Sequence, residues 1–511
     1  MKRALISVFD KTGVVDFAKS LDAMGWEIIS TGGTSKTLKA EGIKVMDISD
    51  LTKFPECFDG RVKTLHPNVE GGILAIRDND NHKKQMAELG VEPIDIVVCN
   101  LYPFKQTILK PGVSHEEIIE NIDIGGPTMI RAAAKNYKFV TVITDPEDYN
   151  LVINELKAKG DTSAETKEML AAKVFIHTSH YDALIAGYFS EKLNIKYPKT
   201  ITLTYERNKI CVMVKIRIKV RLSYTSVKGT EGTLTAAIQL HGKELSYNNI
   251  GDTDGALETL KEFNEPTIVA AKHANPCGVG SASTLVEAYR RAYEADPVSI
   301  FGGIVAANRE IDAATATEMA KIFLEVVVAP SFSKEALEIL TKKKNIRLLQ
   351  LPHISTKGIS ASKAKTVLGG LLIQDLDTLL LNEDELKVVT KRQPTETEMR
   401  DLMFGWKVVK HAKSNGIAIA KDLCTTGVGP GQVSRIWALE NAIRQGGKRI
   451  PGSVMASDAF FPFSDCVEAA HHAGITAIIQ PGGSVRDQES IEAADKYGIA
   501  MIFTGMRHFK H

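Results

Sequence analysis

The chain has 511 residues, of which 44% are hydrophobic and 24% are charged, and its formal net charge at pH 7 is +1. This length exceeds what one hydrophobic core supports, so we expect two or three globular domains. The balanced charge gives no electrostatic case for binding nucleic acid or an anionic membrane. No apolar stretch approaches the roughly 20 residues that a membrane-spanning helix needs.

The N-terminus and the cysteines bear on the cellular compartment. Residues 1–6 lead directly into an apolar strand pattern, without the features of a signal peptide. The cysteines lack C-x-x-C spacing, which suits reduced thiols; they are Cys57, Cys99, Cys211, Cys277, Cys424 and Cys466. We therefore expect a cytoplasmic protein.

The first part of the chain alternates between short apolar runs and helical patterns. The apolar runs at 4–9, 26–30, 96–100 and 140–143 predict strands, and the stretches at 14–21 and 163–193 predict helices. This alternation indicates an α/β fold with a doubly wound, mainly parallel sheet and ligands at the carboxyl ends of its strands. Residues 194–200 read as a linker, so we expect one domain over 1–199 and a larger one over 200–511.

Two polar stretches of this first part suggest anion binding. Ser30–Thr34 separates a strand from a helix predicted over 36–41, and free N–H groups at a helix N-terminus bind phosphate. Residues 58–67 place Arg61, Lys63 and His66 beside glycine and proline. By themselves these stretches are equally compatible with a tight turn and a solvated surface loop.

The second part also alternates strands and helices, around the stretch 272–278. The apolar run 267–271 predicts a buried strand, and Lys272 and His273 follow it, where a loop is expected to begin. A histidine exchanges protons near neutral pH, and a lysine beside it supplies fixed positive charge. The alternative is a structural histidine beside a solvated lysine.

Further strand-and-loop units follow in the second part. A helix is predicted over 283–295, and strands are predicted over 301–305, 325–330, 416–420, 453–456 and 475–479. Several of these strands lead into polar or glycine-rich loops, at 427–432, 457–463 and 481–484. Repeated units of this kind predict a site assembled from several strand ends, although the aromatic run 460–463 also fits plain core packing.

Four motifs in the first part carry a family resemblance. Ser-Thr-Gly-Gly-Thr, Gly-Arg-Val-Lys-Thr-Leu-His-Pro, Asn-Leu-Tyr-Pro-Phe and Asp-Ile-Gly-Gly occur in the order that resembles the inosine monophosphate (IMP) cyclohydrolase domain of a bifunctional purine-biosynthesis family. One departure is Phe9, where the family usually has serine. The resemblance implies a nucleotide site formed by Lys11, Ser30, Thr31, Gly32, Gly33, Thr34, Arg61, Thr64, Cys99 and Asn100.

The resemblance also implies the residues of ring closure, in which a carboxamide nitrogen attacks a formamide carbon and water leaves. This reaction needs an oxyanion stabiliser and proton carriers rather than a metal. Lys63 and Lys135 are expected to be cationic stabilisers or acids. Asp123 is expected to accept a proton, and Tyr102 to relay one.

Motifs of the second part resemble the partner domain of the same family, aminoimidazole carboxamide ribonucleotide (AICAR) formyltransferase. They are Lys-His-Ala-Asn-Pro-Cys-Gly, Lys-Ser-Asn at 413–415, Ser-Asp-Ala-Phe-Phe-Pro-Phe and the stretch 504–511. The resemblance implies 10-formyltetrahydrofolate as co-substrate and a homodimer that shares its sites. It implies that His273 is the base, that Lys272 stabilises the transition state and that Asn415 contacts the substrate carboxamide. It also implies binding residues for the two substrates: Arg435, Phe460 and Asp465 for folate, and Gly302 and Arg507 for the ribonucleotide.

Zinc is the metal to consider at His273 and Cys277. Zinc deaminases join a His-x-Glu to a Pro-Cys-x-x-Cys. Here no glutamate lies two residues after the histidine, and no second cysteine follows at that spacing. We therefore expect no metal.

Residues 208–219 do not fit the family, whose members carry Leu-Arg-Tyr-Gly-x-Asn-Pro-His-Gln in this region. As written, the stretch resembles a basic, amphipathic edge strand. The stretch can be back-translated and read in another frame, in which each new codon takes the last base of one codon and the first two bases of the next. In that frame the codons of Met213 and Val214 can encode only glycine at their junction. The neighbouring codons permit the other residues of the family motif. Our hypothesis is a pair of compensating frameshifts, in the gene or in the recorded sequence. A peptide mass matching the residues as written would rule out a recording error.

Three functions are therefore compared. The first is a bifunctional enzyme that formylates AICAR and closes the product to IMP. The second retains only the cyclohydrolase, because genuine residues over 208–221 would impair formyl transfer. The third is a non-enzymatic regulatory protein that binds nucleotides.

Overall fold

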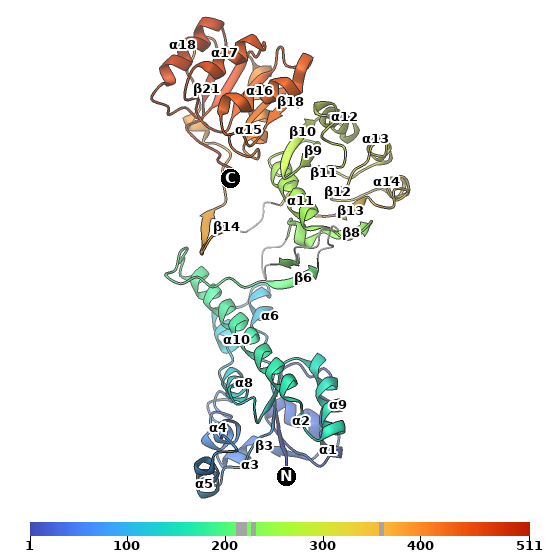
Figure 1. Cartoon of the computed structure of the whole chain (residues 1–511), viewed down its shortest axis with the longest axis vertical. Helices are drawn as coiled ribbons and strands as arrows, with labels where there is room; N and C mark the ends of the chain where they lie inside the picture. Colours follow the sequence, from blue (N-terminus) through green and yellow to red (C-terminus); the bar gives the residue numbers. More distant parts are fainter. Residues whose placement is uncertain (211–221, 226–230, 357–361) are drawn as a thin grey trace. The chain divides into compact units, whose positions relative to one another are not determined.

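The computed structural model describes residues 1–210, 222–225, 231–356 and 362–511 (Figure 1). The chain divides into two compact units, Met1–Thr204 and Tyr205–His511. The division falls close to the linker predicted over 194–200. Residues 211–221, which include most of the stretch assigned to the frameshift hypothesis, lie outside the described residues.

The N-terminal unit is built on a five-stranded parallel sheet. Its strands, in sheet order, are β3 (Val45–Asp47), β2 (Glu27–Ser30), β1 (Arg3–Ile6), β4 (Ile96–Val98) and β5 (Thr141–Ile143). The strands β1 and β4 are buried along their whole length, which explains their continuous apolar sequence. The predicted doubly wound α/β fold is confirmed.

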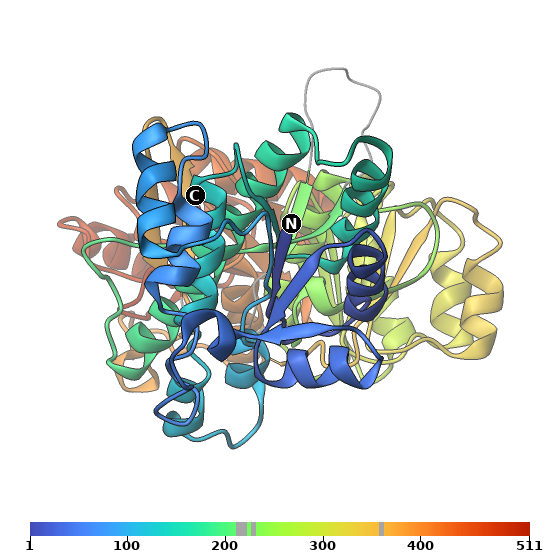
Figure 2. The same ribbon diagram turned by 90° about the horizontal axis from the view of Figure 1, so that it is seen from below.

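Helices flank this sheet, as Figure 2 shows with the blue strands between them. They are α1 (Val14–Ala23), α2 (Gly32–Ala40), α3 (Ile48–Thr52), α4 (Pro67–Leu74), α5 (Asp80–Leu89), α6 (Phe104–Leu109), α7 (His115–Glu120), α8 (Gly125–Lys135), α9 (Tyr149–Lys159) and α10 (Ala164–Lys192). The helix predicted over 36–41 begins earlier, at Gly32, because the two glycines belong to its first turn and not to a loop before it.

The C-terminal unit contains a twelve-stranded mixed sheet. From one edge to the other its strands are β16 (Lys387–Val388), β21 (Ala500–Phe503), β20 (Ala477–Gln480), β19 (Val454–Ser457), β17 (Ile417–Lys421), β18 (Cys424–Gly429), β10 (Asn275–Ser281), β9 (Thr267–Lys272), β11 (Ile304–Ala307), β12 (Val326–Ala329), β13 (Arg347–Gln350) and β8 (Ile238–His241). Two separate hairpins pair β6 (Glu206–Ile210) with β7 (Leu222–Thr225) and β14 (Ser362–Val367) with β15 (Gly370–Asp375).

Helices of the C-terminal unit cover both faces of the large sheet. They are α11 (Tyr247–Leu260), α12 (Leu285–Ala295), α13 (Ala313–Met319), α14 (Lys334–Leu340), α15 (Glu396–Val409), α16 (Arg435–Gly446), α17 (Asp465–His472) and α18 (Asp487–Tyr497). Alternate residues of β9 enter different cores: Val269 and Ala271 pack with α11, whereas Ile268 and Ala270 pack with α12. This is the alternation expected of a strand buried on both faces.

The large sheet consists of two halves with the same strand order, which meet where β10 pairs with β18. In the chain, each half begins with its edge strand, β8 or β16, which a helix and an antiparallel hairpin follow, β9–β10 in the first half and β17–β18 in the second. The hairpin turns correspond: His273-Ala274 in one and Asp422-Leu423 in the other, all four residues with φ between 53° and 58°. The C-terminal unit is therefore a repeated α/β arrangement, as predicted.

The loops predicted at 272–278 and 427–432 are wrong in part, because β10 and β18 occupy much of them. Glycine and proline suggested loops, but the glycines serve helix packing. A Cβ atom at Gly278 would lie 2.1 Å from the carbonyl oxygen of Ala292, and one at Gly429 would lie 1.9 Å from that of Ala438. The backbones of α12 and α16 therefore approach these strands directly.

None of the helices in the part of the chain that the structure describes has the length and hydropathy required to cross a membrane.

Gly429→Ala is expected to lower the free energy of unfolding by about 3 kcal/mol, because the new methyl group forces α16 away from β18. Gly251→Ala is the matched control. Gly251 lies within α11, and no heavy atom would lie within 4 Å of its new Cβ, so stability should rise by up to about 1 kcal/mol. Denaturant unfolding followed by circular dichroism compares the variants, and equal midpoints for the two would contradict this packing argument.

Candidate active sites

The N-terminal unit has a cavity of about 590 Å³ beside the ends of β1, β2 and β4. The carboxyl ends of parallel strands are where α/β proteins bind ligands. The structure brings eleven of the predicted residues into its wall: Lys11, Thr31, Gly33, Thr34, Arg61, Lys63, Thr64, Cys99, Asn100, Tyr102 and Asp123.

One end of this cavity is suited to a phosphate group. A Cβ atom at Gly32 would lie 3.8 Å from the Lys63 ammonium nitrogen, and one at Gly33 would lie 3.9 Å from that of Lys11. Both lysines therefore stand beside the N-terminus of α2, whose first backbone N–H groups lack helical acceptors. Two cations and a helix N-terminus together favour an anion.

Acidic side chains share this end of the cavity. Arg61 forms an ion pair with Glu120, and Lys63 Nζ lies 3.7 Å from Glu56 Oε1. Both carboxylates line the cavity, and an anionic ligand must compete with them for the cations. No spacing in the sequence indicates these two glutamates, because they reach the cavity from separate segments.

Asp123 is a half-buried carboxyl group in the wall of the cavity. Its Oδ1 accepts the N–H of Gly126 at 2.8 Å, and its Oδ2 accepts the N–H of Tyr102 at 3.3 Å. Burial raises the pKa of the Asp123 carboxyl group, against the opposing effects of these two amides and of Lys63. The carboxylate is thus fixed in position and more basic than a solvated aspartate.

Four predicted residues of the N-terminal unit, Ser30, Asn100, Cys99 and Lys135, lie elsewhere or serve another purpose. Ser30 is buried, and its hydroxyl donates to the Ile6 carbonyl at 2.6 Å. Asn100 lines the cavity, but its side chain accepts the N–H groups of Phe9 and Asp10 at 2.6 and 2.9 Å. Cys99 lines the cavity with an uncharged thiol, because burial raises the pKa of the thiol and keeps it protonated.

Lys135 is not brought to the cavity. It is the exposed last residue of α8, whereas Asp123 and Gly126 lie at the start of that helix. At 1.5 Å per residue, the two ends of α8 are about 15 Å apart. The geometry of this chain therefore gives Lys135 no contact with the groups around Asp123.

Two further cavity residues were not predicted as ligands. The Ser7 hydroxyl lies 2.8 Å from the Thr31 hydroxyl, at the matching end of the neighbouring strand. Phe9, at the position where the family usually has serine, packs edge-on against Tyr102 with ring centroids 6.2 Å apart. Ser7 could have been predicted as a cavity residue by aligning the ends of β1 and β2, because Ile6 pairs with Ser30 and Ser7 therefore lies opposite Thr31.

In the C-terminal unit, Lys272 and His273 lie at the tip of the β9–β10 hairpin. Lys272 is half-buried, and its ammonium group donates to the Phe301 carbonyl at 3.0 Å, beside Gly302. His273 is exposed and occupies the left-handed backbone region, with φ of 54°. A non-glycine residue in that region costs about 1–2 kcal/mol, so surrounding contacts must hold it.

Asn415 belongs to a polar network of the second half. Its Oδ1 accepts the Arg435 guanidinium at 2.7 Å, and its Nδ2 donates to the Gln432 carbonyl at 2.9 Å. Arg435 also forms an ion pair with Asp458, and both side chains are buried. Arg435, which was predicted to bind folate, therefore donates hydrogen bonds to protein groups and fixes the orientation of Asn415.

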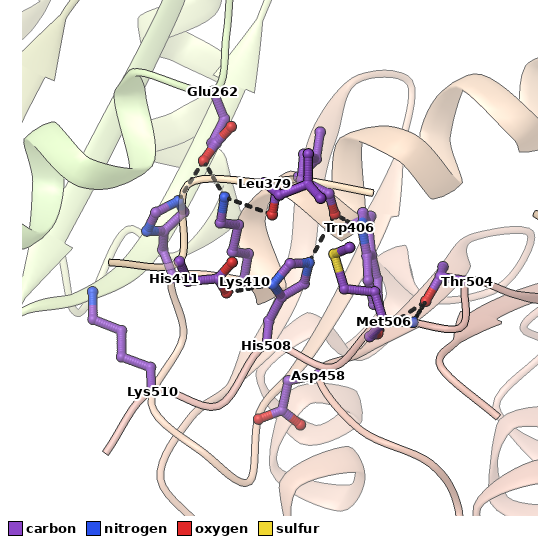
Figure 3. Close-up of polar contacts among 12 residues, drawn as sticks. Glu262, Leu379, Trp406, Lys410, His411, Asp458, Thr504, Met506, His508 and Lys510 are labelled. Carbon is purple, nitrogen blue, oxygen red and sulfur yellow. Dashed lines mark hydrogen bonds and ion pairs between the residues drawn. The ribbon is translucent and has the colours of Figure 1, made fainter. Parts of the chain in front are cut away.

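The C-terminal segment contacts this network and the first half; Figure 3 shows His508 and Lys510 of the segment together with Asp458. Ser414 donates its hydroxyl to Asp458 at 2.6 Å and its N–H to the Lys510 carbonyl at 2.9 Å. The His508 ring contacts the Leu380 carbonyl at 2.8 Å, and the Lys510 ammonium group contacts Glu258 of α11 at 2.7 Å. The tail thus fastens the second half to the first.

A buried ion cluster reinforces that connection. Glu262, just after α11, accepts Lys410 at 2.9 Å and His411 at 3.1 Å, both at the end of α15. Although burial opposes it, these two hydrogen bonds lower the pKa of Glu262 to about 2. The cluster therefore holds the helices of the two halves together while Glu262 stays ionised.

The remaining predicted residues form an exposed edge of this site. The Arg507 guanidinium lies over the Phe460 ring, 4.6 Å from its centroid, and Asp465 is exposed at the start of α17. Only part of the aromatic run is core: Phe461 is fully buried, whereas Phe463 is exposed. Phe460 and Arg507 thus offer a planar, cationic surface for an aromatic ligand.

Cys277 does not behave as a metal ligand. Its thiol donates to the Ala270 carbonyl at 3.4 Å, and burial raises its pKa to about 12, so it stays protonated. Within residues 1–210, 222–225, 231–356 and 362–511, no group of three or more His, Cys, Asp or Glu side chains is arranged to hold a metal ion.

Comparison with known proteins gives two matching family models. One is described as an AICARFT/IMPCHase bienzyme and matches residues 133–445. The other is described as an MGS-like domain and matches residues 13–128.

Relatives similar over the full length share one name, bifunctional purine biosynthesis protein PurH. The chain is 63% identical to the protein of Acetivibrio thermocellus and 62% identical to that of Ruminiclostridium cellulolyticum, each over 513 aligned residues. It is 59% identical to the protein of Bacillus cereus over 510 residues. Each alignment covers 100% of this chain and 100% of the relative.

Proposed function

The chain belongs to the AICARFT/IMPCHase bienzyme family, and from this premise we propose how its two units divide the chemistry. It is an AICAR formyltransferase, with 10-formyltetrahydrofolate as formyl donor, and an IMP cyclohydrolase of purine synthesis. We assign ring closure to the N-terminal unit and formyl transfer to the C-terminal unit. The observation that carries the first assignment is the cavity that joins a phosphate-binding end to Asp123.

Ring closure follows from the groups in that cavity. Lys11, Lys63 and the N-terminus of α2 hold the nucleotide phosphate. The carboxamide nitrogen attacks the formamide carbon, and Asp123 takes the proton released from that nitrogen. The formamide oxygen receives this proton and the proton of the formamide nitrogen, the carbon–oxygen bond breaks, and water leaves as a carbon–nitrogen double bond forms. A cation at the developing oxyanion is commonly worth about 3 kcal/mol, and Lys63 is the cation beside Asp123.

Formyl transfer requires activation of a poor nucleophile, because the attacking amine is conjugated to a carboxamide. Its nitrogen bonds to the formyl carbon, the bond from that carbon to the folate nitrogen breaks, and the folate nitrogen is protonated. His273, exposed at the hairpin tip, accepts the amine proton. Lys272 stabilises the oxyanion, and Asn415, oriented by Arg435, binds the substrate carboxamide.

The two alternative functions are separated by activity assays. The frameshift hypothesis for 208–221 stays open, and genuine residues there predict ring closure without efficient formyl transfer. A regulatory protein would bind the nucleotide and turn over neither substrate. Assays with AICAR plus formyl donor, and separately with formyl-AICAR, distinguish these two functions from the bifunctional enzyme.

We further infer a homodimer that acts in the cytoplasm. The β14–β15 hairpin pairs only with itself among the described strands, and most of its residues are exposed. Leu368 and Leu372 on this hairpin are 105% and 58% exposed. An isolated two-stranded hairpin with apolar side chains in water is marginally stable, so a second copy of the chain is its expected cover. The free cysteines of the described residues fit a reducing compartment.

His273→Ala is expected to lower the rate of formyl transfer by about 10²–10⁴, because the proton acceptor is lost. Ring closure should be unchanged, because it occurs in the other unit. The two assays named above measure both rates. The control is His472→Ala, which removes an exposed imidazole at the end of α17 and should alter neither rate. An equal loss of both activities in His273→Ala would contradict the assignment.

The pH profile of ring closure should reflect the raised pKa of Asp123. Only the ionised carboxylate accepts a proton, so kcat/KM should fall with acid at a pH above the ordinary aspartate value of about 3.9. Because Lys63 lowers that pKa, Lys63→Met should move the acid limb to still higher pH. Lys138→Met, which removes an exposed lysine paired with Asp78, should leave the limb in place. A limb that does not respond to Lys63→Met would argue against this coupling.

Leu372→Asp is expected to weaken the dimer, because a charge enters its apolar contact. Sedimentation equilibrium should show a dimer for the unaltered chain and a monomer at the same concentration for the variant. Leu89→Asp, at a 72% exposed leucine of α5, should remain dimeric. An unaltered chain that sediments as a monomer would disprove the homodimer.

A further inference from the structure

We infer that Asn275 is a positioning residue for formyl transfer, which ties the turn that carries His273 to the loop that carries Asn415. The inference rests on the proposed roles of these two residues. Asn275 follows the turn as the first residue of β10, and it is half-buried. It touches neither the reacting atoms nor the folate in the proposed function, and it acts through its neighbours.

The turn between β9 and β10 needs external support. His273 and Ala274 both have positive φ values, 54° and 58°, which L residues seldom adopt in succession. The Asn275 Nδ2 atom donates to the His273 carbonyl at 3.0 Å. Behind the turn, α11 approaches so closely that a Cβ atom at Gly255 would lie 2.9 Å from the Ala274 carbonyl oxygen. The side chain of Asn275 thus fixes the peptide plane next to the base.

The other end of the same side chain reaches the second half of the unit. The Asn275 Oδ1 atom accepts the backbone N–H of Lys413 at 2.9 Å. Lys413 accepts the N–H of Gly431 at 2.6 Å, and Asn415 is held by Gln432 and Arg435. The loop at 413–415 is therefore fixed on its far side by the second half, and Asn275 sets its separation from the His273 turn.

The β17–β18 hairpin has a turn of the same shape, Asp422-Leu423, which carries no predicted site residue and is held in a different way. The Asp401 carboxylate of α15 accepts the N–H groups of Asp422 at 2.8 Å and Leu423 at 2.9 Å. The residue that follows this turn is Cys424, whose thiol contacts the Arg291 carbonyl at 3.2 Å. A turn of this shape therefore does not require asparagine after it. The amide is found in the hairpin whose tip must be aligned with a second loop.

An amide suits this position because it donates in one direction and accepts in the other with a fixed geometry. Aspartate at 275 would still accept the Lys413 N–H, but it could not donate to the His273 carbonyl. It would also place a negative charge beside His273, which favours the imidazolium form. The two ends of the side chain can thus be tested separately.

The experiment compares Asn275→Ala and Asn275→Asp with Cys424→Ala, the variant of the matching position in the other hairpin. In Asn275→Ala, kcat for formyl transfer should fall about 10–100-fold, because base and carboxamide contact are no longer aligned. The KM for AICAR and the rate of ring closure should each stay within about twofold of the unaltered chain. The melting temperature should fall by no more than about 8 °C, because the variant loses two hydrogen bonds of a half-buried side chain. Cys424→Ala should leave both activities unchanged.

Asn275→Asp should also lower kcat, and it should move the acid limb of formyl transfer to higher pH, because the base is active only when neutral. Two results would overturn the inference. One is an Asn275→Ala enzyme with full kcat while His273→Ala is inactive, which leaves the proposed function intact. The other is a parallel loss of melting temperature and of both activities in the two Asn275 variants, which indicates a structural role. If His273→Ala itself retained formyl transfer, the proposed function would fail first, and Asn275 would have no base to position.

Discussion

The site that we propose for formyl transfer depends on the contact between β10 and β18, where the two halves of the C-terminal sheet become one. This contact is short: Val279 N–H donates to the Thr425 hydroxyl at 2.9 Å, and Ser281 N–H donates to the Leu423 carbonyl at the same distance. It places the hairpin tip that carries His273 beside the half that carries Asn415. Glycines in β10 and β18 let the backbones of α12 and α16 pack directly against the strands. The hairpin tip therefore extends from a closely packed part of the sheet. His273 and Asn415, the proposed base and carboxamide contact, come from different halves, and the sheet that joins the halves aligns them.

Electrostatics are organised differently in the two units. In the N-terminal cavity, the cations Arg61 and Lys63 stand beside Glu120 and Glu56, so positive charge is matched locally until an anion enters. In the C-terminal unit, the Arg435–Asp458 pair is buried and serves to orient Asn415. Burial of an ion pair gives little net stability, but removal of one partner leaves an isolated charge. Its effect here is positional, because Arg435 fixes the amide of Asn415.

The inner strands β1, β4, β9, β17, β19 and β20 were predictable because each is a continuous apolar run that is buried along almost its whole length. The position of Ser30–Thr34 between a strand and a helix was predictable as well. Three features could not be read from the pattern. Gly278 and Gly429 suggested loops, yet only the packed helices show that they are strand positions. The separation of Lys135 from Asp123 follows from the rise along α8. The hydrogen bond between Asn275 and Lys413 joins residues that are 138 positions apart in the chain, so no local pattern of the sequence predicts it.

The exposure of His273 bears on how the C-terminal site works. A base in open water competes with solvent for its proton, and the fixed charge of Lys272 is screened there. Efficient transfer therefore requires that bound substrate and folate, or a neighbouring chain, exclude water from the hairpin tip. The β14–β15 hairpin has the complementary problem, since its leucines stand in solvent without a covering element in the described residues. A homodimer resolves both problems if each copy covers the exposed groups of the other. Loss of the dimer should then lower formyl transfer more than ring closure, because the N-terminal cavity already encloses its proton acceptor within one chain.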